Sequence, residues 1–196
     1  MKTKPKLSLN YLVGIDVPNH IKEEINFFLQ KYAASFSQDL KWINFNEYHI
    51  TIAYLGKITE HQRERLIGVT DRLSLPPFSI EIQGLGFFPP GSNPKFLRVG
   101  INNGREEMNI FAENVRQKIA KEAGLIPKNK FYPFITVGEI INPFLDKKNI
   151  FNFISENWDY PFGGFKIDNF HLYRLNKSQY VHNHKIKLKK SKYKNI

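Results

Sequence analysis

The chain has 196 residues, with 29 lysines and arginines against 18 acidic residues, 41% hydrophobic residues and no cysteine. The lack of cysteine excludes disulfide scaffolds, thiol catalysis and cysteine-ligated metal centres. No window approaches the ~18 consecutive apolar residues of a membrane span, and no secretory signal core follows the N-terminal lysines. We therefore expect a single domain over residues 1–196, in a cytoplasmic protein that does not bind membranes. We also expect the protein to be a monomer.

The excess of positive charge lies mostly at the C-terminus. Eight of the 29 basic residues follow Asp168, the last acidic residue, so residues 1–168 carry 21 bases against all 18 acids. Residues 185–196 form a basic tail with two interpretations. The tail can bind phosphate backbones by salt-dependent attraction, or it can be a solvated chain end that keeps the protein soluble.

The first half of the chain alternates strands and helices. From hydrophobic periodicity we expect strands at residues 9–16, 39–43, 48–55 and 78–85, and helices at 19–35 and 59–73. Thr59 is expected to cap the second helix, which would bury Leu66, Val69 and Leu73.

The second half continues this alternation. We expect a loop at residues 84–94, strands at 95–101 and 133–140, helices at 105–123 and 144–154, and a closing hairpin with arms 165–173 and 180–188. The hydrophobic phase of the first hairpin arm changes near Asp168 and Asn169. A β-bulge at that point would reconcile the two phases.

Two of the predicted strands carry the same sequence pattern. Residues 49–55 read HITIAYL and residues 134–140 read FITVGEI, and the two copies begin 85 residues apart. A helix is expected after each copy. Two such copies indicate two similar lobes that face one another, because a solenoid needs at least three shorter repeats.

The first copy carries residues suited to phosphodiester chemistry. Residues i and i+2 of a strand point to the same face, so His49 and Thr51 emerge side by side. If a second strand offered the same pair across a groove, two imidazoles could exchange protons with a phosphodiester while two hydroxyls bound its oxygens. Such a site needs no metal ion and no cofactor.

The ordered set of motifs resembles the 2H phosphoesterases, specifically the bacterial and archaeal RNA 2′,3′-cyclic phosphodiesterases, also called 2′-5′ RNA ligases. The similar segments are YLVGIDVP at 11–18, HITIAYL at 49–55, GLGFFP at 84–89, PFITVG at 133–138 and FHLY at 170–173. The resemblance implies an α+β fold with two antiparallel sheets facing a central groove and helices on the outside. It also implies that His49 donates a proton, that Thr51 and Thr136 bind phosphate, and that RNA ends or nucleotide 2′,3′-cyclic phosphates are the substrates.

The second motif departs from the family. Phe134 stands where the family has its second histidine, and Glu139 stands where an arginine commonly closes the motif. Phenylalanine cannot accept a proton, and loss of a general base typically costs about 10²–10⁴ in rate. The expected activity is therefore reduced hydrolysis of RNA 2′,3′-cyclic phosphates to 2′-phosphates. The alternative is a catalytically inactive protein that binds RNA or nucleotides, with Phe134 as a base-stacking platform.

Other histidines leave one question open. His171, His182 and His184 lie on the last predicted strands, and any of them could replace the missing imidazole if it reached the groove. We interpret His171 as an ordinary hydrogen-bonded or surface histidine. A metal site at His182 and His184 is disfavoured because no carboxylate is nearby in the sequence.

Overall fold

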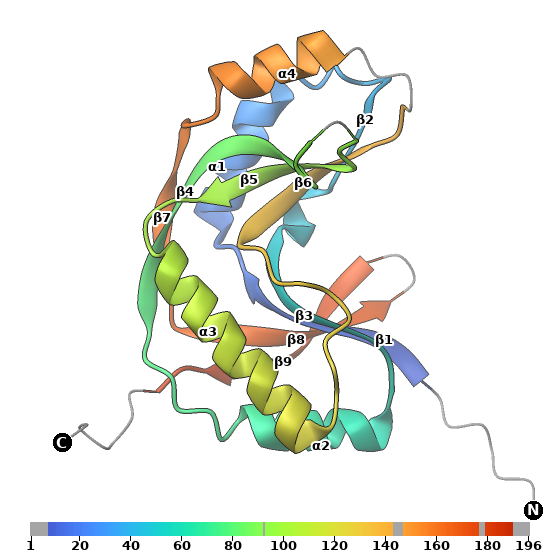
Figure 1. Ribbon diagram of the computed structural model, residues 1–196, viewed down its shortest axis with the longest axis vertical. Coiled ribbons are helices and arrows are strands. Elements are labelled where there is room, and N and C mark those ends of the chain that lie inside the picture. Colours follow the sequence, from blue (N-terminus) through green and yellow to red (C-terminus); the bar gives the residue numbers. More distant parts are fainter. Residues whose placement is uncertain (1–7, 92, 143–146, 177–178, 190–196) are drawn as a thin grey trace, which may run out of the picture.

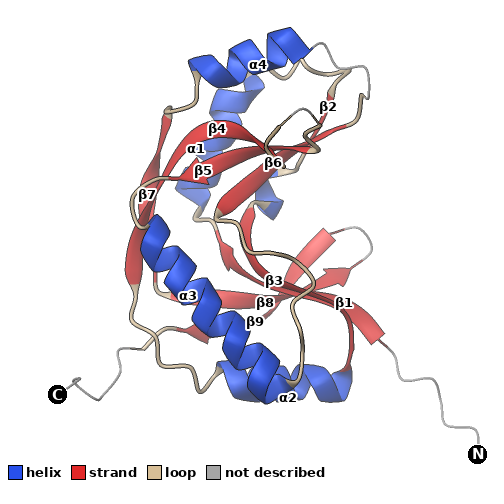
Figure 2. Cartoon of the chain, viewed as in Figure 1, coloured by secondary structure: helices blue, strands red, loops and turns tan. Residues whose placement is uncertain are grey.

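The computed structural model describes residues 8–91, 93–142, 147–176 and 179–189, and these residues form two antiparallel sheets (Figures 1 and 2). The four-stranded sheet consists, in order, of β3 (His49–Thr59), β1 (Ser8–Asp16), β8 (Asn169–Asn176) and β9 (Gln179–Lys187). The five-stranded sheet consists of β2 (Leu40–Trp42), β6 (Phe134–Ile140), β5 (Phe96–Ile101), β4 (Phe78–Phe88) and β7 (Pro161–Ile167).

Helices pack on both sheets. α2 (Glu60–Thr70) and α3 (Arg105–Lys118), with a π-helical end at Ile119–Ala123, contact each other and pack on β3. α1 (Asn19–Gln30) contacts β7, and α4 (Lys147–Glu156) contacts β4. A 3₁₀ turn at Phe45–Glu47 precedes β3. The expected α+β architecture of two antiparallel sheets is confirmed, and the helices lie toward the outside of the molecule (Figure 2).

The predicted cap of α2 is confirmed. The backbone N–H of Gln62 donates to Thr59 Oγ1 at 3.3 Å, and the backbone N–H of Thr59 donates to Gln62 Oε1 at 2.9 Å. This reciprocal pair satisfies two donors that the start of a helix leaves free. Leu66, Val69 and Leu73 are buried as expected.

α1 ends earlier than the predicted 19–35. Beyond Gln30 the backbone N–H groups of Tyr32 and Ala33 donate three residues back, to the carbonyls of Leu29 and Gln30, which tightens the chain into turns. Tyr32 still packs against Phe153 of α4, with ring centroids 4.4 Å apart. The hydrophobic spacing therefore predicted correctly that Tyr32 packs inward, but it predicted a helix that is too long.

The predicted loop at 84–94 is wrong over its first half, because β4 continues to Phe88. Gly84 has φ +76°, and a Cβ atom there would lie 1.9 Å from the carbonyl oxygen of Trp158. The glycine permits this close approach and a register shift within the strand. Gly84 therefore belongs to a strand that another backbone segment approaches closely, and not to a loop.

The predicted first hairpin arm at 165–173 is also wrong, because it contains parts of two strands. Residues up to Ile167 pair with β4 in the five-stranded sheet, whereas residues from Asn169 onward pair with β1 and β9 in the four-stranded sheet. Asp168 lies at the crossing between the sheets, so no bulge is needed to explain the change of hydrophobic phase. The second arm at 180–188 corresponds to β9, with Leu188 buried beyond its end.

Two expectations fall partly outside the described residues. The start of the predicted helix at 144–154 and the part of the basic tail beyond residue 189 are not described. Across the described ranges, no helix is both long and apolar enough to cross a membrane.

Candidate active site

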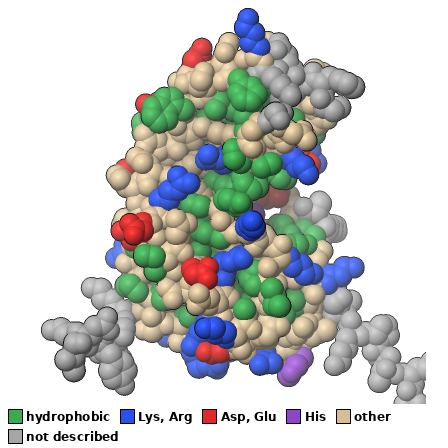
Figure 3. All heavy atoms as spheres, in the orientation of Figure 1, with side chains coloured by type: hydrophobic (Ala, Val, Ile, Leu, Met, Phe, Trp, Pro, Cys, Tyr) green, Lys and Arg blue, Asp and Glu red, His purple; other side chains and the backbone are tan. Residues whose placement is uncertain are grey.

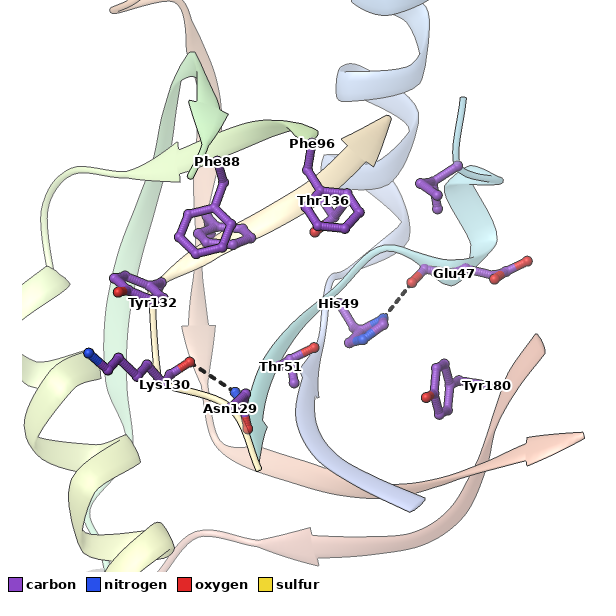
Figure 4. A pocket seen from close by; sticks show the side chains of 12 residues that line it. Glu47, His49, Thr51, Phe88, Phe96, Asn129, Lys130, Tyr132, Thr136 and Tyr180 are labelled. Carbon is purple, nitrogen blue, oxygen red and sulfur yellow. Dashed lines mark hydrogen bonds between the residues drawn. The ribbon is translucent and has the colours of Figure 1, made fainter. Parts of the chain in front are cut away.

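The two motif strands, β3 and β6, contact each other across the space between the sheets. A pocket of about 450 Å³ opens there, and the space-filling view shows a hollow between the two halves of the molecule (Figure 3). We call it the His49 pocket; it is lined by Ile43, Glu47, His49, Thr51, Phe88, Phe96, Asn129, Lys130, Tyr132, Phe134, Thr136 and Tyr180 (Figure 4). The fold thus brings together all four residues that the sequence singled out: His49, Thr51, Phe134 and Thr136.

His49 is held by the backbone that precedes it. Its Nδ1 atom lies 2.6 Å from the carbonyl oxygen of Glu47 (Figure 4). A carbonyl only accepts, so Nδ1 carries the proton and Nε2 is left for a ligand. Gly14 lies beneath on β1, where a Cβ atom would come within 2.9 Å of the Ile50 carbonyl oxygen and 3.5 Å of His49 Cδ2. The glycine therefore leaves room for the imidazole.

The environment of His49 favours its neutral form. Burial lowers the pKa of the imidazole, and the charges of Lys22 and His182 add to this effect. The Glu47 hydrogen bond and the charge of Asp16 act in the opposite direction. The pKa remains below its ordinary value, so a minority of the rings are protonated at neutral pH.

The two threonines lie on opposite sides of the pocket. Thr51 follows His49 on β3 and Thr136 follows Phe134 on β6, each two residues on and each partly exposed. Neither hydroxyl forms a hydrogen bond with another residue in the described part of the chain. Both hydroxyls are therefore free to donate to oxygens of a ligand placed between the strands.

Phe134 belongs to an aromatic wall on the side of the five-stranded sheet. Its ring centroid lies 4.9 Å from that of Phe88 and 6.4 Å from that of Tyr132, and Phe88 and Tyr132 are 4.7 Å apart. Arg98 Cζ lies 6.0 Å from the Phe134 centroid. We call Phe88, Tyr132 and Phe134 the aromatic wall. It offers apolar ring surface at the position where the resemblance implies a second imidazole in the family.

The other strand histidines lie elsewhere. His171 and His182 stack at 4.2 Å and line a separate pocket of about 400 Å³, which also contains Asp16. His171 is buried, and its Nε2 lies 2.7 Å from Asn169 Oδ1, which confirms the interpretation as a hydrogen-bonded strand histidine. His184 pairs with Asp71 at 2.9 Å. Among the described lining residues of the His49 pocket, His49 is the only histidine.

The described residues contain no group of three or more side chains suited to hold a metal ion. His182 lies 3.7 Å from Asp16, and His184 contacts a different carboxylate, Asp71. The two histidines are therefore engaged with separate acidic partners.

The sequence did not predict a set of hydrogen bonds from Arg116 and Asn129 that joins the two sides of the His49 pocket; we call it the clamp. Arg116 Nη1 donates to the Ile52 carbonyl oxygen at 2.8 Å, and Nη2 donates to the Asn129 carbonyl oxygen at 2.7 Å. Asn129 Oδ1 in turn accepts from the backbone N–H of Tyr54 at 2.7 Å. These bonds fix the segment before β6 against β3. The only sequence signal was the position of Asn129 shortly before the second motif.

The match to known proteins agrees with this geometry. Residues 15–97, which include His49 and Thr51, match the model of the LigT like Phosphoesterase family. An RNA 2′,3′-cyclic phosphodiesterase of Methanocaldococcus jannaschii is 26% identical over 167 residues, covering 85% of this chain and 91% of that protein. A protein of the same name from Aquifex aeolicus is 32% identical over 129 residues, covering 64% and 63%. Apo LigT of E. coli superposes with a TM-score of 0.72 at 16% identity, covering 93% of this chain and 99% of that one.

The two-sheet fold is similar to that of the 2H phosphoesterases, and the pocket holds one His-x-Thr pair, His49 and Thr51, opposite a second copy of the motif in which Phe134 precedes Thr136. Within this likeness, residues 15–97 match the LigT like Phosphoesterase family, and the chain is similar in sequence to RNA 2′,3′-cyclic phosphodiesterases.

Proposed function

We propose that the protein hydrolyses RNA 2′,3′-cyclic phosphate ends to 2′-phosphates without a metal ion. The observation that carries the proposal is the placement of His49 and Thr51 opposite Thr136 in one pocket, with both hydroxyls free. The names of the relatives support the same reaction. Because the two threonines come from different sheets, we infer that residues 1–196 act as one bilobal unit around this pocket.

The chemistry follows from the available atoms. The hydroxyls of Thr51 and Thr136 donate to the non-bridging oxygens and stabilise the charge that builds up on phosphorus. Water attacks phosphorus, the bond to the ribose 3′ oxygen breaks, and protonated His49 transfers the Nε2 proton to that leaving oxygen. The attacking water loses its proton to solvent, because Phe134 provides no acceptor. The rate is therefore below that of a two-histidine site, by about 10²–10⁴.

The direct test uses an RNA that ends in a 2′,3′-cyclic phosphate, assayed with excess chelator. We expect the wild type to open the ring and His49→Ala to lose at least about tenfold in rate. His20→Ala is the matched control, because His20 is exposed at the start of α1 and lies outside the pocket lining. Equal rates for wild type and His49→Ala would refute catalysis by His49. Loss of wild-type activity on chelation would refute metal independence.

The aromatic wall favours a second function, that of a nucleic-acid binder without catalysis. Ring faces stack on any nucleobase, typically at about 1–3 kcal/mol per base. If wild type and His49→Ala share the background rate, binding of a nucleoside 2′-phosphate that is weakened by Phe134→Ala would identify this function. No detectable binding at low salt would exclude it.

A further inference from the structure

Arg98 places a guanidinium on the pocket-facing side of the five-stranded sheet without an acidic partner. In the register of the sheet it lies opposite Thr136 on β6 and opposite Gly86 on β4. Paired residues of an antiparallel sheet project to the same face, so Arg98 shares the face of Thr136. Its Nε donates to the Phe87 carbonyl oxygen at 3.3 Å, and no ion pair joins it to any residue that the structure describes.

Two glycines make room for this guanidinium. A Cβ atom on Gly86 would lie 3.0 Å from Arg98 Cζ, and a Cβ atom on Gly100 would lie 3.1 Å from Nη1 and 2.9 Å from the Gln83 carbonyl oxygen. All three contacts are closer than those that Cβ atoms normally make. Arg98 is therefore packed down on the sheet surface, and the residue is half-buried.

Beside Arg98 lies a pocket of about 430 Å³ that is rich in hydrogen-bond donors. Its polar and aromatic lining comes from Gln83, Arg98, Asn102, Arg105 and Trp158, and we call it the arginine pocket. None of the described residues that line it is acidic. Glu106 and Glu107 follow Arg105 in the first turn of α3 and, together with Arg105, line a more open depression beside it. The indole of Trp158 is 68% exposed, so its surface is available to a ligand.

The electrostatics of the arginine pocket favour an anion. Burial lowers the pKa of Arg98, and the charge of Arg105 lowers it further, with no acidic group acting in the opposite direction. The two guanidinium groups repel one another, and neither forms an ion pair with a residue that the structure describes. A bound phosphate would relieve this repulsion and accept their N–H groups, which match its geometry.

Arg98 of the arginine pocket lies next to Phe134 of the His49 pocket. Phe134 lines the His49 pocket, and Arg98 Cζ lies 6.0 Å from its ring centroid. We propose that Arg98 and Arg105 bind the phosphodiester that precedes the 3′-terminal nucleotide of an RNA strand, while Phe134 and the aromatic wall contact the terminal nucleoside. The inference rests on the proposed function, and it makes an RNA strand a better substrate than a mononucleotide.

The test compares three substrates of the full chain: adenosine 2′,3′-cyclic phosphate, a diadenosine dinucleotide that ends in a 2′,3′-cyclic phosphate, and the same dinucleotide with a neutral methylphosphonate linkage. For wild type we expect kcat/KM to be about tenfold higher for the charged dinucleotide than for either other substrate. Arg98→Met and Arg105→Met should remove most of this preference and leave hydrolysis of the mononucleotide near the wild-type value. Arg72→Met is the matched control, because Arg72 is an exposed arginine in the turn after α2 whose weak ion pair with Glu122 lies outside both pockets.

The outcomes separate the two proposals. The proposed role of the arginine pocket is wrong if the preference for the charged dinucleotide persists in both arginine variants. It is also wrong if wild type hydrolyses all three substrates without this preference. Either result leaves the proposed function standing. If wild type hydrolyses none of them, the proposed function fails. Fluorescence polarisation with a labelled dinucleotide 2′-phosphate and its methylphosphonate analogue then tests the arginine pocket alone. A preference for the charged linkage that Arg105→Met removes supports it, and equal binding of the two ligands overturns it.

Discussion

The Nδ1 atom of His49 lies 2.6 Å from the carbonyl oxygen of Glu47, two residues earlier in the chain. This hydrogen bond fixes both the orientation of the ring and the position of its proton. Nε2 is consequently the atom that exchanges a proton with a ligand. Because Phe134 provides no second imidazole, the pH dependence of the reaction should report His49 alone among the histidines.

We expect kcat/KM for a 2′,3′-cyclic phosphate to fall as pH rises through the pKa of His49. A proton donor must be protonated, and burial lowers this pKa from the ordinary value of 6.5. The rate should therefore be highest below that pKa and decrease about tenfold per pH unit above it. A rate profile between pH 4.5 and 8 measures this, and His49→Gln should give a flat one. A rate that rises with pH through the same window would show that Nε2 accepts a proton from water instead.

Phe134→His should increase activity. The substitution puts an imidazole two residues before Thr136 on β6, which reproduces the spacing of His49 and Thr51. Arg98 lies beside the ring and disfavours a second positive charge, so the introduced imidazole should be neutral and able to accept a proton. We expect a gain of about 10²-fold in kcat/KM at pH 7, within the usual range for a general base.

Phe134→Leu is the control for this gain, because it removes the aromatic ring without adding a proton acceptor. The double variant His49→Ala, Phe134→His should lose most of the gain, since the leaving oxygen then has no donor. If Phe134→Leu and Phe134→His are equally active, the effect comes from opening the pocket and the general-base explanation is wrong.

The sequence predicted the local parts of the site and missed the parts that depend on distant residues. The positions of His49 and Thr51 follow from the two-residue period of a strand, and the likeness to Thr136 indicated a second strand opposite. The clamp could not be predicted, because Arg116 reaches the Ile52 carbonyl across 64 residues of sequence. The assignment of residues 165–173 to one strand failed for a similar reason, since sheet membership depends on partners far along the chain.

The clamp should affect catalysis without contacting substrate. Arg116→Met leaves the carbonyls of Ile52 and Asn129 without their donors, which should lower the free energy of unfolding by about 1–3 kcal/mol. It should also lower kcat by roughly tenfold, because the segment that carries Lys130 and Tyr132 is no longer held against β3. Lys118→Met on the same helix, which removes only an exposed ion pair with Glu122, is the control. A fall in stability with unchanged kcat and KM at a temperature where the variant is folded would limit Arg116 to a structural role.

His171 should make the protein less stable in mild acid. Burial lowers its pKa from 6.5 to about 4, with the charge of His182 contributing, so the folded state leaves this imidazole neutral between those two pH values. The unfolded chain takes up a proton in the same window, which favours unfolding as pH falls from 6.5 to about 4 and adds nothing above 6.5. Urea midpoints at pH 7.5, 5.5 and 4.5 should therefore decrease in wild type and decrease less in His171→Leu, whereas His20→Leu should follow wild type. Part of the decrease should remain in His171→Leu, because the pKa of His49 is lowered as well. An identical pH dependence in wild type and His171→Leu would show that the His171 imidazole gains a proton at the same pH in both states.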